Sequence, residues 1–167
     1  SSLPPLVSGG VFSVSSSILI EASRERVWGV LLDFSSYGQW REQTVVDATS
    51  KNPLSDQIPQ EGQRLLMKVH IPPTMDDSKS FQTTEEIITH VDNANFRIAW
   101  KYATLPEWLL RAERWQTLSE VSPGRTKYET QEVFGGILAY VIKIFLRNGL
   151  EEAFDAMAAT LKSRSEE

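Results

Sequence analysis

The alternation of apolar and polar residues predicts strands over most of the chain, with helices near its two ends. In a strand, successive side chains face opposite sides of a sheet, and this pattern is found in seven segments. These segments are residues 11–21, 44–48, 64–71, 81–91 and 96–102, and two strands within 111–134. Apolar residues at helical spacing follow Ser23, which is suited to be an N-cap. A second short helical turn is predicted over 33–40, and one long helix is predicted from Leu138 to about Ser163. The order predicts an α+β fold in which a curved seven-stranded antiparallel sheet wraps around the C-terminal helix.

The last two predicted strands meet at the turn signal Ser122-Pro123-Gly124-Arg125. Closing a hairpin there places these pairs on one face: Val121–Thr126, Ser119–Tyr128, Thr117–Thr130, Trp115–Glu132 and Glu113–Phe134. The opposite face carries mostly charged and amide side chains, so we expect it to be solvated and the first face to be interior. Glu132 is then an inward carboxylate. Such a group is paired, protonated or functional, because burying an unpaired charge is expensive.

A second hairpin is predicted around residues 92–95. Its register pairs Val91–Phe96, Thr89–Ile98, Ile87–Trp100 and Glu85–Tyr102 on the inner face. The same register places Glu86 and His90 on the outer face, where Glu86 meets Lys101 as an opposite-charge pair. Glu85 is therefore predicted to face inward.

Composition restricts the classes of function. The 167 residues are 41% hydrophobic and 23% charged, which predicts one globular domain over 11–167 after a flexible arm at 1–10. A net charge of -5 argues against nucleic acid or an anionic membrane surface as partner. No apolar run is long enough for a membrane span and no leader is visible, so we expect a cytoplasmic protein. The absence of cysteine and two widely spaced histidines argue against a metal site, and nothing indicates a cofactor.

The inward residues include several rings and hydroxyls that suit a ligand cavity. Inward rings could stack a planar ligand, although any core of this size also contains rings. Inward threonines favour a partly wet pocket, since a purely structural core would prefer valine or isoleucine. The apolar start of the last helix is predicted to line the cavity on one side, with its other side covered by residues 103–110 or by a second copy of the chain. The predicted ligand-binding residues are Met67, Val69, Thr83, Ile87, Trp100, Tyr102, Trp115, Thr117, Tyr128, Thr130, Phe134, Val141 and Phe145.

Glu132 and Glu85 are the predicted catalytic residues. Glu132 is interpreted either as a general base or ligand anchor, or as a structural carboxylate that accepts backbone N–H bonds or pairs with Arg111. Glu85 is interpreted either as a second catalytic carboxylate or as a solvated group at the open end of the sheet. Both alternatives remain open for each residue.

Several short motifs resemble the START-like (SRPBCC, helix-grip) superfamily, and in particular its polyketide cyclase/dehydrase-like branch. The similarity covers roughly residues 11–163. The motifs are Ile20-Glu21-Ala22 with Val27-Trp28, Leu31-x-Asp33-Phe34-x-x-Tyr37-x-x-Trp40, Glu61-Gly62, Ile98-Ala99-Trp100, Thr126-x-Tyr128-x-x-x-Glu132-x-Phe134-x-Gly136 and Phe154-x-x-Met157-x-x-x-Leu161. Many relatives carry a histidine at the position of Thr130, which places any role of that histidine in doubt here.

The resemblance implies a protein that takes a small, largely apolar molecule, polyketide-like or another natural product, into an internal cavity. Cyclase or dehydratase chemistry in secondary metabolism is the implied activity, with Glu132 and Glu85 moving protons. The alternatives are a non-catalytic carrier or sensor of a lipid or isoprenoid-like ligand, and an interaction module that docks a partner through the apolar helix start. The chain is expected to be a monomer or a homodimer.

Overall fold

The structure, a computed structural model, describes residues 10–34, 41–69 and 82–167 of the chain. Within these ranges it forms a seven-stranded antiparallel sheet with the strand order β1-β7-β6-β5-β4-β3-β2. The strands are β1 (Phe12–Ile20), β2 (Arg41–Val46), β3 (Arg64–Val69), β4 (Gln82–Asp92), β5 (Arg97–Tyr102), β6 (Arg111–Ser122) and β7 (Arg125–Gly135). The helices are α1 (Arg24–Leu32), α2 (Ile137–Phe145) and α3 (Arg147–Glu166). The predicted α+β architecture is confirmed, while residues 1–9 of the predicted arm at 1–10 and residues 35–40 of the predicted helical turn at 33–40 fall outside the described residues.

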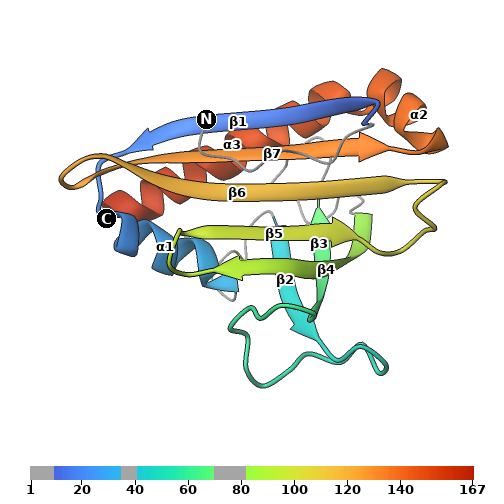
Figure 1. Ribbon diagram of the computed structural model, residues 1–167, viewed down its shortest axis with the longest axis horizontal. Helices are drawn as coiled ribbons and strands as arrows, with labels where there is room; N and C mark the ends of the chain where they lie inside the picture. Colours follow the sequence, from blue (N-terminus) through green and yellow to red (C-terminus); the bar gives the residue numbers. More distant parts are fainter. Residues whose placement is uncertain (1–9, 35–40, 70–81) are drawn as a thin grey trace, which may run out of the picture.

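Helix α3 lies along one face of the sheet beside the edge strand β1 (Figure 1). We call this face the inner face. Helix α1 lies at the end of the sheet that holds the β6–β7 turn, and α2 lies at the opposite end with the loop between β5 and β6 (Figure 1). The hydroxyl of Ser16 on β1 donates to Asp155 Oδ1 on α3 at 2.6 Å, which ties the helix to the edge strand.

Helix α1 forms where its cap and apolar spacing predicted it. Ser23 Oγ accepts a hydrogen bond from the Arg26 N–H at 3.3 Å and so satisfies a donor of the first turn. Val27, Trp28 and Leu31 bury one side of the helix against the core. The amide oxygen of Asn93 accepts from Trp28 Nε1 at 3.0 Å, so α1 is also joined to the β4–β5 turn.

The C-terminal segment was predicted as one long helix, and this prediction is wrong because the chain breaks at Leu146 (φ -118°, ψ -8°). Leu146 N–H still donates to Ile142 O at 2.8 Å, and Leu150 N–H donates to Leu146 O at 2.9 Å. The two helices share one core cluster, which holds Ala139 of α2 and Phe154 of α3, and α3 extends beyond it. Ala139 and Ile142 of α2 pack at the far end of the sheet, whereas Met157 and Leu161 of α3 pack in the larger core cluster near α1.

Both predicted hairpins contain a β-bulge, and each bulge changes which residues face inward. The β6–β7 ladder shifts between Glu120 and Ser122, leaving Val121 as the extra residue. The β4–β5 ladder shifts between Ile88 and His90, leaving Thr89 as the extra residue. Since side chains alternate along a strand, one extra residue exchanges the inner and outer sets of the bulged strand beyond it. The predicted faces are therefore correct on β5 and β7, and reversed on β6 and on β4 before the bulge.

Candidate functional site

A file of polar side chains runs along the inner face of β6 and β7, beneath α3. The ladder places Arg114 opposite Glu132, and Gln116 opposite Thr130. Tyr128, the next inward residue of β7, completes the group, which we call the inner polar cluster. Four of the five side chains are buried and Glu132 is half-buried. Polar groups at this depth normally have hydrogen-bonding partners.

Arg114 carries a buried positive charge among neutral acceptors. Its side chain is 3% exposed, Nε donates to Thr130 Oγ1 at 3.0 Å, and Nη2 donates to Met157 Sδ at 3.0 Å. The guanidinium carbon lies 4.0 Å from the ring centroid of Phe154 and 5.8 Å from that of Trp100. Among the described residues, its hydrogen-bond acceptors are thus a hydroxyl and a thioether. A buried cation is usually paired with an anion, so this guanidinium is suited to hold a negatively charged or strongly polarised oxygen.

Gln116 is fully buried, and its amide is half satisfied. Gln116 Oε1 accepts from the Tyr128 hydroxyl at 2.6 Å. Gln116 Nε2 has no acceptor among the described residues. A buried donor left without an acceptor destabilises a fold by about 1–3 kcal/mol, so this amide is a second group suited to an oxygen atom of a ligand.

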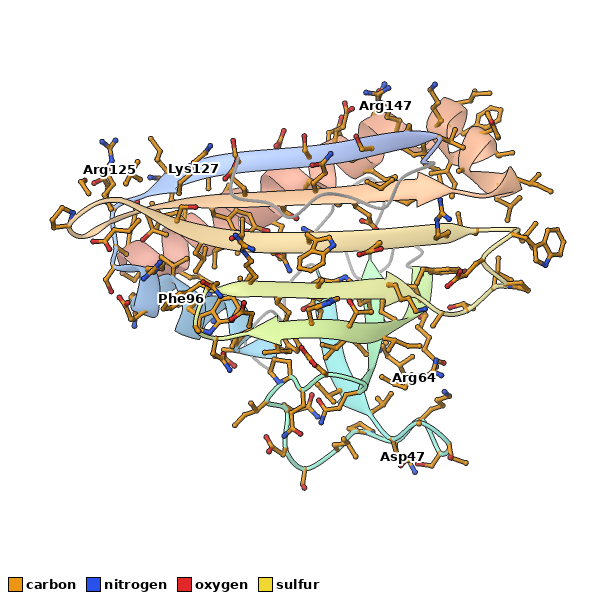
Figure 2. The ribbon with its side chains drawn as sticks, viewed as in Figure 1. Asp47, Arg64, Phe96, Arg125, Lys127 and Arg147 are labelled. Carbon is orange, nitrogen blue, oxygen red and sulfur yellow. The ribbon has the colours of Figure 1, made fainter. Side chains whose placement is uncertain are left out.

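Glu86, not Glu85, is the inward carboxylate of β4. Glu86 is 7% exposed and lies opposite Tyr102 on β5 and Leu65 on β3. Glu85 is instead on the other face, where its Oε1 accepts from Lys51 Nζ and from Arg64 Nη1, each at 2.8 Å (Arg64 in Figure 2). The prediction that Glu85 faces inward is wrong because the bulge at Thr89 reverses the strand. Glu86 was assigned to the solvated face for the same reason. Arg114 and Gln116 were assigned to that face because the bulge at Val121 reverses β6 in the same way.

Several predicted ligand-binding residues do lie on the inner face. Trp100 is almost fully buried there, and Tyr102 and Phe134 pack in the core cluster below α2. The inward residues among the predicted set are Met67, Trp100, Tyr102, Tyr128, Thr130 and Phe134. Glu132 is also on this face, as predicted. The side chain of Val69 lies outside the described part of the chain.

The other predicted ligand-binding residues face away from the cluster. Trp115 and Thr117 are on the outer face of β6, where Trp115 Nε1 donates to Glu113 Oε1 at 2.7 Å and the indole contacts the His90 ring. Thr83 and Ile87 are on the outer face of β4, for the reason given for Glu85. Val141 and Phe145 project outward from α2, whose Ala139 and Ile142 face the core instead.

A largely apolar cleft of about 400 Å³ opens beside α1. Its lining residues are Gly29, Leu32, Asp33, Phe34, Gln57, Ile58 and Pro59. The Phe34 ring meets Trp100 edge-on, with ring centroids 6.4 Å apart, and Trp100 in turn lies beside the Arg114 guanidinium. Two rings therefore separate this cleft from the inner polar cluster.

Residues 10–34, 41–69 and 82–167 contain neither a candidate metal site nor a candidate membrane span. Within these ranges, no group of three histidine, aspartate or glutamate side chains is arranged to hold a metal ion. None of the helices there is long and apolar enough to cross a bilayer.

Comparisons with known proteins place this geometry in context. The family model "Polyketide cyclase / dehydrase and lipid transport" matches residues 11–166. No curated protein sequence matches significantly. The Zhui aromatase/cyclase from Streptomyces sp. R1128 is similar in structure, with a TM-score of 0.62 and 11% identity, over 92% of this chain and 94% of that chain.

Two further solved structures are similar. A START superfamily protein from Mycobacterium smegmatis has a TM-score of 0.60 and 16% identity, over 90% of this chain and 97% of that chain. The di-domain ARO/CYC BexL of the BE-7585A biosynthetic pathway has a TM-score of 0.61 and 19% identity, over 93% of this chain and 50% of that chain. At these identities the likeness establishes the START-like helix-grip fold.

Proposed function

The chain belongs to the polyketide cyclase/dehydrase and lipid transport family, as its motifs indicated, and we propose that it binds a small, largely apolar, polyketide-like molecule between the inner face and α3 and catalyses its cyclisation or dehydration. The observation that carries this proposal is the buried Arg114 guanidinium, whose hydrogen-bond acceptors among the described residues are both neutral. A core that served folding alone would place an apolar side chain there. An oxygen-rich, apolar ligand supplies the acceptors that Arg114 and Gln116 Nε2 need, and rings to pack against Trp100 and Phe154.

The proposed reaction assigns a separate role to each polar group. The Glu132 carboxylate removes a proton from a methylene carbon between two carbonyl groups of the ligand. That carbon attacks another carbonyl carbon of the same molecule, a carbon–carbon bond forms, and the electron pair of the attacked C=O moves to its oxygen. The oxygen takes the proton back from Glu132, and loss of water completes a dehydration. Arg114 stabilises the enolate oxygen, and Gln116 Nε2 donates to a carbonyl oxygen.

Two features refine the assignment of proton transfer. Thr130 stands where many relatives carry histidine, and here it bridges Arg114 Nε and the Trp115 carbonyl, to which its own hydroxyl donates at 3.1 Å. Proton transfer therefore falls to Glu132, with Glu86 rather than Glu85 as the second inward carboxylate. One positioned acid/base group typically supplies a rate gain of about 10²–10⁴.

Turnover tests the catalytic part of the proposal, with Glu85 as the matched control. A linear poly-β-ketone thioester is incubated with the wild type, E132Q and E85Q, and the products are separated and weighed by mass spectrometry. We expect E132Q to lose at least about 100-fold in turnover. E85Q, which changes a glutamate of the other face, should stay within about twofold of the wild type, because its carboxylate lies away from the inner polar cluster. Unchanged turnover in E132Q would remove its acid/base role.

The rival function, a carrier or sensor, uses the same residues without proton transfer. Native mass spectrometry of freshly purified protein shows whether an apolar molecule copurifies and gives its mass. If that molecule is recovered unmodified from the wild type, and E132Q changes only its affinity, the protein is a carrier.

A further inference from the structure

Helix α2 carries a second apolar face that nothing in the described structure covers. Ala139 and Ile142 face the core, but the stripe at positions i, i+3, i+4, i+7 and i+8 points to solvent. This stripe consists of Ile137, Tyr140, Val141, Ile144 and Phe145, each at least half exposed. Ile144 and Phe145 are 74% and 77% exposed, which is unusual for side chains of this size.

Trp108, in the loop between β5 and β6, extends this stripe. The loop is fixed to the start of α2, since Ile137 N–H donates to Trp108 O at 3.3 Å and Leu138 N–H donates to Leu109 O at 2.9 Å. The indole is 67% exposed, and loop and helix lie together at one end of the sheet (Figure 1). We call Trp108 and the α2 stripe the apolar tip. The tip joins two elements whose large side chains project from the same end of the molecule.

The charges around the apolar tip favour one kind of occupant. Helix α2 contains no carboxylate, and its one charged residue, Lys143, lies beside the stripe on the helix surface. Arg147 follows at the start of α3 (Figure 2), where it pairs with Glu151, and Glu107 beside Trp108 pairs with Lys101, so these charges are matched. A second copy packed helix against helix would bring Lys143 near its equivalent with no α2 carboxylate to neutralise it. A phospholipid bilayer instead accepts the apolar side chains among its acyl chains while the lysine reaches the phosphate groups.

We propose that the apolar tip docks the protein on the surface of a phospholipid bilayer. Tryptophan and tyrosine favour the boundary between headgroups and acyl chains, and Trp108 and Tyr140 supply one of each. The nine-residue α2 is too short to span the bilayer and lies in its interface. The net charge of -5 opposes attraction to anionic membranes, so apolar insertion provides the main driving force and Lys143 a smaller local one.

The apolar tip lies at the end of the sheet next to the inner polar cluster. Beneath α2 lies a core cluster that includes Phe134 and Phe154, and Phe154 contacts the Arg114 guanidinium. A bilayer at the apolar tip thus lies next to the element that closes this end of the sheet. The docking proposal does not depend on whether the ligand is transformed. A protein that fails to bind vesicles can therefore be distinguished from one that fails to catalyse the proposed reaction.

Vesicle flotation tests the docking with the full chain. Vesicles of phosphatidylcholine, with and without phosphatidylglycerol, are mixed with the wild type, with I144E/F145E and with I58E/V121E. The last variant is the matched control, because Ile58 and Val121 are exposed apolar residues outside the apolar tip. We expect the wild type and the control to float with both kinds of vesicle, and I144E/F145E to bind at least about tenfold more weakly. Brominated phosphatidylcholine should quench wild-type tryptophan fluorescence, and W108F should lose that quenching.

The outcomes that overturn the proposal are distinct. If the wild type binds neither kind of vesicle, and light scattering shows a dimer that I144E/F145E dissociates, the occupant is a second copy. If the wild type neither floats nor dimerises, no bilayer docks there. If I58E/V121E loses binding as strongly as I144E/F145E, the binding is not directed by the apolar tip. If the wild type binds only the vesicles that contain phosphatidylglycerol, and K143Q abolishes that binding, the interaction depends on headgroup charge. Apolar insertion is then rejected as the driving force.

Discussion

The buried hydrogen bond from the Tyr128 hydroxyl to Gln116 Oε1 sets the stability of the inner polar cluster. Tyr128→Phe removes the donor and leaves the whole Gln116 amide without a partner among the described residues. The expected loss in free energy of unfolding is about 1–3 kcal/mol, measured by urea denaturation. Y128F/Q116M should recover most of that loss, because removing both polar partners leaves nothing unsatisfied. Y140F, on the exposed side of α2, is the control, and an equal loss in Y140F would contradict the account.

At the residue scale, the direction of each side chain depended on bulges that have no recognisable sequence signature. Tyr128, Thr130, Glu132 and Phe134 were predicted to face inward and do so, because they alternate along one unbroken strand. Trp115 was assigned to the wrong face because Val121 adds a residue before the turn. Binary patterning reinforced the error, since an inner face that holds arginine and glutamine resembles a solvated one. Local rules of this kind are expected to fail at functional sites.

At the element scale, Gly136 connects β7 to α2 in a conformation and a space that suit glycine. Its φ is +86°, and an added Cβ would lie 2.8 Å from the backbone of Leu109. Gly124 in the β6–β7 turn has a similar φ of +74° but open space around it. An alanine at Gly124 loses about 1–2 kcal/mol from its left-handed backbone. At Gly136, where ψ is 177°, the backbone is in a region essentially limited to glycine.

Gly136→Ala should therefore be less stable than Gly124→Ala, because only the former also pushes α2 away from the β5–β6 loop. Urea denaturation compares the two variants. In G136A, faster hydrogen exchange at the Leu138 amide, which donates to Leu109 O, would locate the damage at this contact. Equal stability of the two variants would show that the β5–β6 loop moves to accommodate the added Cβ without a loss in free energy of unfolding.

Most elements could be predicted because their patterns are local. The strand pattern located all seven strands, and Ser23 marked the start of α1. The break at Leu146 was missed because apolar residues continue on both sides of it, although Asn148 and Gly149 just beyond it are poor helix formers. The exposed stripe of α2 was also not predicted. The apolar segment predicted a covered surface, but the residues of the stripe are exposed in the described structure.

At the scale of the whole molecule, the inner polar cluster divides the core in two. Met157, Trp100 and Tyr128 belong to the larger apolar cluster near α1, whereas Phe154 and Phe134 belong to the smaller one below α2. The Arg114 guanidinium contacts side chains of both clusters. The order of elements and the motifs were sufficient to predict the family, because they describe the whole chain. They did not predict this arrangement, because the bulge at Val121 is what turns Arg114 and Gln116 inward.

Three exposed carboxylates, those of Glu166, Asp47 and Asp92, have pKa values below their ordinary values. Hydrogen bonds from the Glu21 N–H and from the Lys162 ammonium, each 2.7 Å long, lower the pKa of Glu166 below its ordinary value of 4.5. Hydrogen bonds from Ser50 lower the pKa of Asp47, and those from Asn95 lower the pKa of Asp92, both below 3.8. The unfolded chain therefore takes up these protons at a higher pH than the folded chain. Their stabilisation is complete above the ordinary pKa values and is lost as the pH falls through the lowered ones.

Glu166→Gln tests this linkage, because Glu166 joins the end of α3 to the residue after β1. The amide keeps an acceptor for the Glu21 N–H but has no charge to lose. We expect the wild type to become less stable in urea as the pH falls from about 6 to about 3, and E166Q to show a shallower decline that meets the wild-type curve at the acid end. E152Q, which changes an exposed glutamate on the same helix, should follow the wild-type slope. Parallel curves for the wild type and E166Q would mean that this contact between the end of α3 and the residue after β1 does not contribute to stability in solution.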